Sequence, residues 1–99
     1  MNITTTVTQA NIEKGQPKCN DGCPLALSFK NHATVRHVSI FETYAWLFMK
    51  NPDKNITHVR QYNFSKKMYE FVHGFDNGET VEPQEFTFTD EMLTSDKYL

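Results

Sequence analysis

The sequence predicts a single small domain of the α+β class, with a four- to five-stranded, mostly antiparallel sheet packed by two short helices. The chain has 99 residues, which is enough for one hydrophobic core. Several short segments alternate apolar and polar residues, whereas one segment repeats apolar residues at helical spacing. Aromatic residues make up 13% of the chain, and rings at this density fill a small core and argue against disorder. We assign residues 1–89 to the domain and residues 90–99 to an acidic C-terminal tail, frayed or forming a short helix.

The N-terminal third of the chain predicts one strand and two short helices. Residues 2–7 alternate and are rich in threonine, as in a strand. Thr8 is expected to cap a short helix over residues 9–14. A second helix is expected over residues 24–31, because Pro24 is well tolerated in the first turn of a helix.

The middle of the chain predicts three strands. In a strand over residues 34–41, alternate residues point to opposite faces, and Arg36, Val38 and Ile40 are expected to share one of them. Residues 43–49 and 55–62 are expected to form a hairpin, because an Asn-Pro-Asp turn signal separates them.

A longer helix and an edge strand follow. Ser65 is expected to cap a helix near residues 66–75, in which four apolar residues recur at i, i+3, i+4 and i+7. Residues 81–89 alternate and contain Pro83, as in an edge strand. The predicted core consists of Val38, Ile40, Trp46, Phe48, Met68, Phe71, Val72 and Phe75.

The charge is distributed unevenly along the chain. The formal net charge is -2 and the pI is about 6.0, which argues against general nucleic-acid binding. Residues 50–67 nevertheless carry five basic residues and one acid, and residues 70–99 carry eight acids and one lysine. The acidic segment is expected either to aid solubility or to bind a basic groove on a partner protein.

The chain shows no signal for a membrane or for secretion. Its first residues have neither a basic nor an apolar signal-peptide region, and no apolar run approaches the roughly 18–20 residues of a membrane helix. We therefore expect a cytoplasmic protein without membrane association, whose two cysteines are thiols or metal ligands.

Two cysteines and two histidines are arranged in the order of a zinc site. Cys19 and Cys23 are followed by His32 and His37, and zinc prefers four nitrogen or sulfur ligands in a tetrahedron. The spacer between the cysteine and histidine pairs is shorter than usual for such sites. The alternative interpretation is two packed thiols and two surface histidines.

The segment from His58 to Lys67 interleaves basic and aromatic residues. His58, Arg60 and Tyr62 are expected to share one face of a strand. Lys66 and Lys67 would then lie in the first turn of the next helix, where free backbone N–H groups favour anions. The five residues form a candidate nucleotide-binding site, the alternative being a solvated strand face and a polar helix start.

Four pieces of the sequence resemble a family of small proteins encoded by bacteriophages. The pieces, which span about residues 3–88, are Val7-Thr8-Gln9-x-x-Ile12-x-x-Gly15, Cys19…Cys23-Pro24-Leu25-Ala26-Leu27, Phe75-Asp76-x-Gly78 and Val81-x-Pro83-x-x-Phe86. The chain differs from this pattern in having three residues between its cysteines, instead of two, and a longer aromatic middle over residues 41–64. The resemblance brings with it no activity and no catalytic residue.

These observations lead to a functional hypothesis. The chain contains no nucleophile elbow, no phosphate-binding glycine loop and no metalloprotease helix, so we expect no enzymatic activity. The resemblance implies a phage accessory protein in the host cytoplasm that counters antiviral defence by binding. It would either sequester a signalling nucleotide or block a host defence protein, as a homodimer and without a cofactor. The alternative is a small structural or regulatory module stabilised by zinc.

Overall fold

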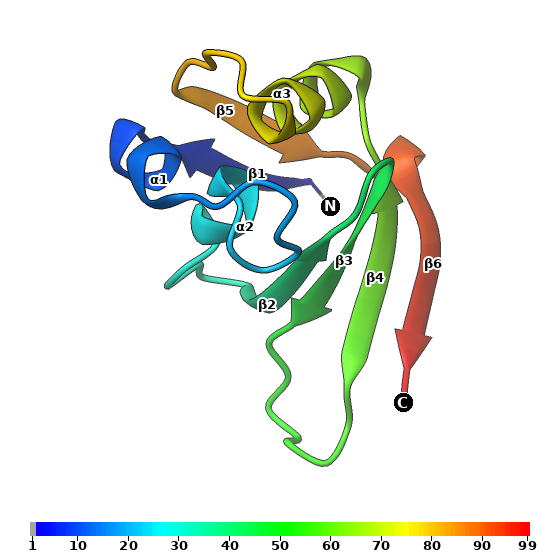
Figure 1. The fold of residues 1–99 in the computed structure, drawn as a ribbon. Coiled ribbons are helices and arrows are strands. Elements are labelled where there is room, and N and C mark those ends of the chain that lie inside the picture. Colours follow the sequence, from blue (N-terminus) through cyan, green and yellow to red (C-terminus); the bar gives the residue numbers. More distant parts are fainter. Residues whose placement is uncertain (1) are drawn as a thin grey trace.

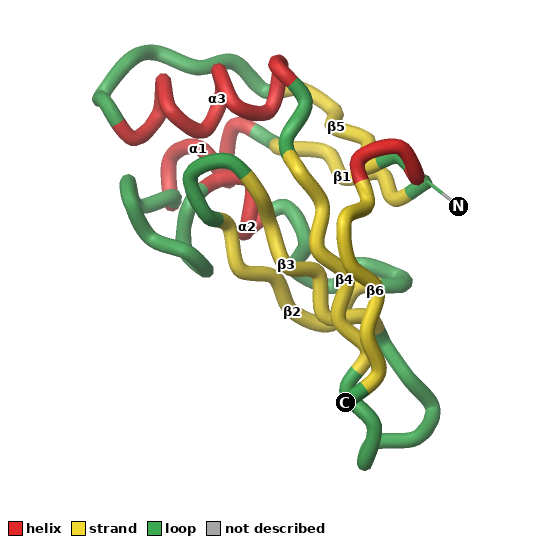
Figure 2. Tube along the Cα trace, turned by 90° about the vertical axis from the view of Figure 1, so that its right-hand side faces the viewer, coloured by secondary structure: helices red, strands yellow, loops and turns green. Residues whose placement is uncertain are grey.

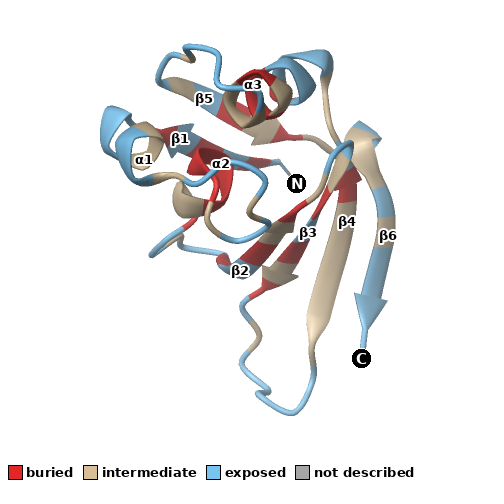
Figure 3. Cartoon of the chain, viewed as in Figure 1, coloured by how far each residue is buried: buried red, intermediate tan, exposed pale blue. Residues whose placement is uncertain are grey.

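The computed structural model describes residues 2–99 and confirms a single domain of the α+β class (Figure 1). Over these residues, two antiparallel sheets replace the one sheet that the sequence predicted. One has four strands in the order β2-β3-β4-β6, and the other pairs β1 with β5. The core lies between the two sheets and the helices, where Figure 3 shows most of the buried residues.

The smaller sheet joins the two ends of the predicted domain. Strand β1 (Ile3–Val7) pairs antiparallel with β5 (Gln84–Phe88), and each alternates buried and more exposed residues. Helix α1 (Gln9–Lys14) follows at the expected place, and Thr8 caps it by accepting a hydrogen bond from the backbone N–H of Asn11. The local signals of the N-terminal strand and helix are thus confirmed.

Helix α2 (Pro24–Leu27) is shorter than the sequence predicted. After one turn the chain continues as turns as far as Asn31, whose φ of 62° lies in the left-handed region. Pro24, Leu25 and Ala26 are buried. This single turn therefore contributes apolar side chains to the core, although it is too short to cover a sheet face.

The four-stranded sheet consists of β2 (Val35–Ile40), β3 (Tyr44–Met49), β4 (His58–Asn63) and β6 (Leu93–Tyr98). The predicted hairpin is confirmed, because β3 and β4 pair antiparallel along their whole lengths. Figure 2 shows the four strands side by side, with β6 at one edge.

The expectation that residues 90–99 form a frayed or helical tail is wrong, because most of these residues belong to this sheet. Residues 90–92 form the short 3-10 helix η1 (Asp90–Met92), and the strand that follows, β6, pairs with β4. In this register Asp96 lies opposite Arg60. The pairing of opposite charges across the two strands gives a physical reason why so polar a segment is ordered.

The predicted faces of β2 and β3 are partly wrong. A bulge between Val35 and His37 shifts the register of β2, so Val35 is buried and Arg36 is exposed. In β3 the buried residues are Ala45, Leu47 and Met49, which places Trp46 and Phe48 on the opposite face, outside the core. Because side chains alternate along a strand, an error of one residue moves every ring to the other side of the sheet.

Helix α3 (Lys66–Asp76) begins where the sequence predicted. The Ser65 Oγ accepts a hydrogen bond from the Met68 backbone N–H at 3.2 Å. The side chains of Met68, Phe71 and Val72 are buried, whereas Phe75, which the sequence predicted to be in the core, is only half-buried. Phe71 contacts Phe86 edge to face, so the helix packs on β5 (Figure 1). Over residues 2–99, the structure contains no helix with the length and apolar character of a membrane span.

Candidate functional site

The residues predicted on β4 do share one face of the four-stranded sheet. His58, Arg60 and Tyr62 lie opposite Met49, Leu47 and Ala45 of β3, on the side that carries the core. We call this side the inner face. The sequence therefore placed these three side chains together correctly.

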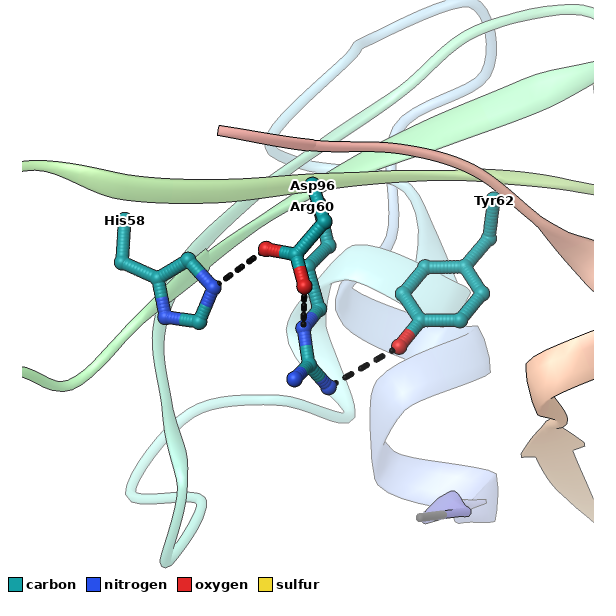
Figure 4. A network of polar contacts seen from close by, with 4 residues as sticks. All are labelled: His58, Arg60, Tyr62 and Asp96. Carbon is teal, nitrogen blue, oxygen red and sulfur yellow. Dashed lines mark hydrogen bonds and ion pairs between the residues drawn. The ribbon is translucent and has the colours of Figure 1, made fainter. Parts of the chain in front are cut away.

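The carboxylate of Asp96 links His58 and Arg60 in a polar network (Figure 4). The imidazole Nε2 of His58 lies 2.6 Å from one carboxylate oxygen of Asp96, and Arg60 Nε lies 3.4 Å from the other. Arg60 Nη1 donates a hydrogen bond to the Tyr62 hydroxyl at 3.3 Å. The side chains of His58 and Arg60 are only 11% and 17% exposed, against 36% for Asp96.

The network leaves little capacity to bind an anion. Burial lowers the pKa of Arg60, but the hydrogen bond to Tyr62 and the negative charge of Asp96 outweigh it, so the net pKa is raised. The guanidinium is therefore a cation whose counter-charge is already in contact with it. Tyr62 is fully buried, so its ring is not available for a base to stack on. We interpret the network as one that holds β6 to β4.

The two lysines of the predicted site have other partners. Lys66 Nζ lies 3.8 Å from the Glu70 carboxylate, on the exposed side of α3. Lys67 Nζ donates a hydrogen bond to the Glu85 backbone carbonyl and lies 5.1 Å from the ring centroid of Phe86. No contact within residues 2–99 joins either lysine to the network around Asp96, so the five residues do not form one site.

The four predicted zinc ligands are not brought into one site. His32 Nε2 donates to the Thr4 carbonyl, and its Nδ1 accepts from the Thr34 N–H, so both ring nitrogens are used within the fold. His37 lies on the other side of the sheet, with its ring against Phe48. In the part of the chain that the structure describes, no group of three or more His, Cys, Asp or Glu side chains is arranged to hold a metal ion.

The two cysteines are unbridged thiols. Burial raises the pKa of Cys23 to about 11, although two backbone hydrogen bonds at the start of α2 lower it in part. Cys23 is therefore a protonated, packed thiol at neutral pH. The thiol of Cys19 donates to the Asp21 carboxylate at 3.4 Å.

A pocket of about 320 Å³ lies beside the cysteines, between their loop and the C-terminal half of α3. Its polar groups already hold the loops together. Asp76 accepts a hydrogen bond from the Lys18 backbone N–H at 2.8 Å, and His73 Nε2 donates to the Glu42 carbonyl at 3.1 Å. Because these polar groups are bonded within the fold, we interpret the pocket as a structural feature and not as a binding site.

The opposite side of the four-stranded sheet, which we call the outer face, carries an aromatic cluster that includes Trp46 and Phe48, two residues that the sequence predicted to be in the core. Its central rung consists of Ser39, Trp46, Gln61 and Ser95, one residue from each strand. The next rung consists of His37, Phe48, Val59 and Lys97. Phe41, Tyr44 and Leu99 extend the face at its two ends.

The rings of the outer face are held in place by one another. Phe41 stacks on Tyr44 with centroids 4.7 Å apart and meets Trp46 edge to face at 5.0 Å. The Trp46 indole N–H donates to the Gln61 side chain at 3.0 Å, so its polar atom is satisfied although the ring is 38% exposed. A shallow groove of about 240 Å³ runs from Trp46 and Phe48 to Leu99. The outer face is thus an ordered aromatic surface that contains one permanently charged side chain, Lys97, in its two central rungs.

No protein-family model, curated protein or solved structure matches this chain. The resemblance to phage proteins therefore stays a prediction.

Proposed function

We propose that this protein is a non-enzymatic binding protein that docks a protein partner on the outer face of its four-stranded sheet. The observation that carries the proposal is the aromatic cluster of the outer face, in which Trp46 is exposed and Phe48 is half-buried outside the core. Interfaces between proteins are depleted of charge at their centre and enriched in aromatic residues, and the outer face has both properties. Exposed Trp and Tyr side chains are also the residues that most often dominate binding energy.

A protein partner fits this surface better than a small ligand does. The groove of about 240 Å³ is smaller than the roughly 300–1,000 Å³ of ordinary ligand pockets. From strand spacing and rise, the four strands present about 400 Å² of projected area. A protein surface can cover an area of this size, which also includes the polar side chains of Ser39, Gln61 and Lys97.

A binding role also agrees with the state of the reactive groups. The imidazoles of His32, His58 and His73 are engaged with backbone carbonyls or with Asp96, and the thiol of Cys23 is protonated. The resemblance to phage proteins favours a host defence protein as the partner. This chain would inhibit that protein by covering its functional surface. Nucleotide sequestration by His58, Arg60, Tyr62, Lys66 and Lys67 is less well supported, since the first three are engaged internally and the lysines lie elsewhere.

The test compares affinity capture from host lysate by the wild-type protein and by two variants of matched exposure. Trp46→Ala removes the centre of the outer face, whereas Tyr69→Ala removes a 43% exposed aromatic ring of α3, an element outside the four-stranded sheet. We expect one host protein to be retained by the wild-type and Tyr69→Ala proteins and to be lost with Trp46→Ala. Equal capture by all three proteins, or capture by none, would contradict the proposal.

Sedimentation analysis of the purified protein supplies the second arm of the test. The sequence predicted a homodimer, and a second copy of the chain is the competing occupant of the outer face. A stable dimer that Trp46→Ala converts to a monomer would assign the face to self-association and overturn the proposal of a different partner.

A further inference from the structure

A third hollow lies at the far end of the four-stranded sheet, between the bulge of β2 and the loop that joins β3 to β4. Its volume is about 460 Å³. Figure 1 shows this loop extending beyond the end of the sheet, away from the helices. We call it the basic pocket, because Arg36, Lys50 and Lys54 line it.

The charge of the basic pocket is unbalanced. Three cations face one carboxylate, that of Asp53, in a protein whose net charge is -2. Within residues 2–99, no carboxylate forms an ion pair with Arg36, Lys50 or Lys54. This distinguishes the pocket from the Asp96 network, where the guanidinium of Arg60 already has its counter-charge. Three cations without partners around one hollow create a positive potential that attracts anions.

The local backbone explains why the cations gather there. Arg36 occupies the bulge of β2, and a bulge redirects a side chain away from the regular alternation of the strand. Lys50 is fixed at the start of the loop, because its backbone N–H donates to the Thr34 carbonyl at 3.0 Å. The two cations therefore converge on the pocket from two adjacent strands, β2 and the end of β3.

The loop also supplies neutral donors. The Asn51 Oδ1 accepts from the Asp53 N–H, and the Asp53 carboxylate accepts from the Asn55 N–H. Asn51 thus uses its acceptor inside the loop and has its amide hydrogens left to donate. Thr57 contributes a hydroxyl to the lining. The one carboxylate at the pocket, that of Asp53, is held by the backbone of its own loop, and the three cations outnumber it.

We propose that the basic pocket binds a small phosphorylated molecule, a site and a ligand class separate from the docking of a protein partner. Guanidinium groups bind phosphate through paired N–H donors, and lysines add charge from the side. The side chains of Met49 and Ile56 give the pocket an apolar wall for the organic part of the ligand. The volume lies within the range of ordinary ligand sites.

The proposal is tested by calorimetric titration of the full chain with two probes, inorganic pyrophosphate and a nucleoside diphosphate. Both carry the same phosphate chemistry, and their comparison separates recognition of phosphate alone from recognition of an attached organic group. We expect saturable 1:1 binding that weakens as salt is raised. Equal affinities for the two probes would show that the pocket recognises phosphate alone. Tighter binding of the nucleoside diphosphate would show that the apolar wall also contacts the ligand.

Variants locate the binding. Arg36→Gln is expected to raise Kd by about tenfold or more. Arg36→Lys is expected to raise Kd less, because lysine keeps the charge without the paired donors. Lys66→Gln is the matched control, since Lys66 is a 90% exposed cation outside the pocket. Trp46→Ala is expected to leave Kd unchanged, which separates this site from the outer face.

Three results would overturn the proposal. The first is the absence of binding of either probe at millimolar concentration and low salt. The second is binding that Arg36→Gln and Lys54→Gln leave unchanged while circular dichroism shows both variants folded. The third is tighter binding of a single-stranded oligonucleotide than of the nucleoside diphosphate. That result would make a nucleic-acid strand, and not a small molecule, the ligand of the pocket.

Discussion

Replacing Asp96 by Asn tests whether the Asp96 network is structural. The variant keeps the shape of the side chain and removes the charge that lies between His58 and Arg60. Hydrogen bonds to charged groups contribute about 1.5–3 kcal/mol, and removing one partner of a fully buried ion pair costs about 3–5 kcal/mol. Because Asp96 is 36% exposed, solvent screens part of this effect. We therefore expect the free energy of unfolding to fall by about 2 kcal/mol.

Thermal and urea unfolding followed by circular dichroism measure this loss. For a domain of this size, about 2 kcal/mol lowers Tm by about 8–16 °C. Glu91→Gln, which neutralises an exposed carboxylate of η1, is the control and is expected to change stability by less than about 0.5 kcal/mol.

A double variant identifies the cause. If the loss comes from a buried cation left without its partner, then Arg60→Met combined with Asp96→Asn is expected to be more stable than Asp96→Asn alone. An Asp96→Asn protein as stable as the wild type would refute the reasoning, and it would return His58 and Arg60 to the set of candidate ligand-binding residues.

Four further tests address the fold around the sites. Ser65→Ala removes the acceptor of the Met68 N–H and is expected to cost about 1 kcal/mol in thermal unfolding, whereas Ser65→Asp keeps the cap. Gly78→Ala is expected to lower the free energy of unfolding by about 1 kcal/mol, and Gly78→Asn by less. The φ of Gly78 is 79° and a Cβ there would meet nothing within 4 Å, so the loss would come from backbone strain and not from a clash. At pH 8 iodoacetamide is expected to alkylate Cys19 and not Cys23, and reaction at Cys23 first would contradict its burial. Between pH 9 and about 11 only the folded chain holds the Cys23 proton, so stability is expected to fall by about 2–3 kcal/mol as pH rises, and Cys23→Ala is expected to lack this drop.

The elements that the sequence located correctly are those set by local signals. The caps at Thr8 and Ser65 are hydrogen bonds within four residues of chain, so the residue types alone predict them. The hairpin of β3 and β4 is likewise marked by a turn between two strand-like segments. Each of these features depends on neighbours in the chain, and not on distant contacts.

What the sequence missed depends on distant partners. Strand β3 contains only apolar or aromatic residues between Tyr44 and Met49, so alternation does not show which set faces inward. The bulge at Arg36 and the pairing of β6 through Asp96 are likewise set by the neighbouring strands. The candidate ligand and metal residues are not brought together for the same reason, since spacing in the chain does not reveal internal partners such as Asp96 or the Thr4 carbonyl.

The orientation of β3 follows from space on the inner face, and it bears directly on function. Ala45 lies opposite Tyr62, a fully buried ring that itself contacts Phe88 of the second sheet. A small residue at position 45 makes room for that ring, and the alternation of the strand then directs Trp46 outward. Burial of the inner face does not require large rings on the outer face, where polar residues of good strand propensity would leave less apolar surface in water. Trp46, which is 38% exposed, thus keeps apolar surface in water that burial of the inner face does not require, and this asymmetry favours a surface kept for a partner.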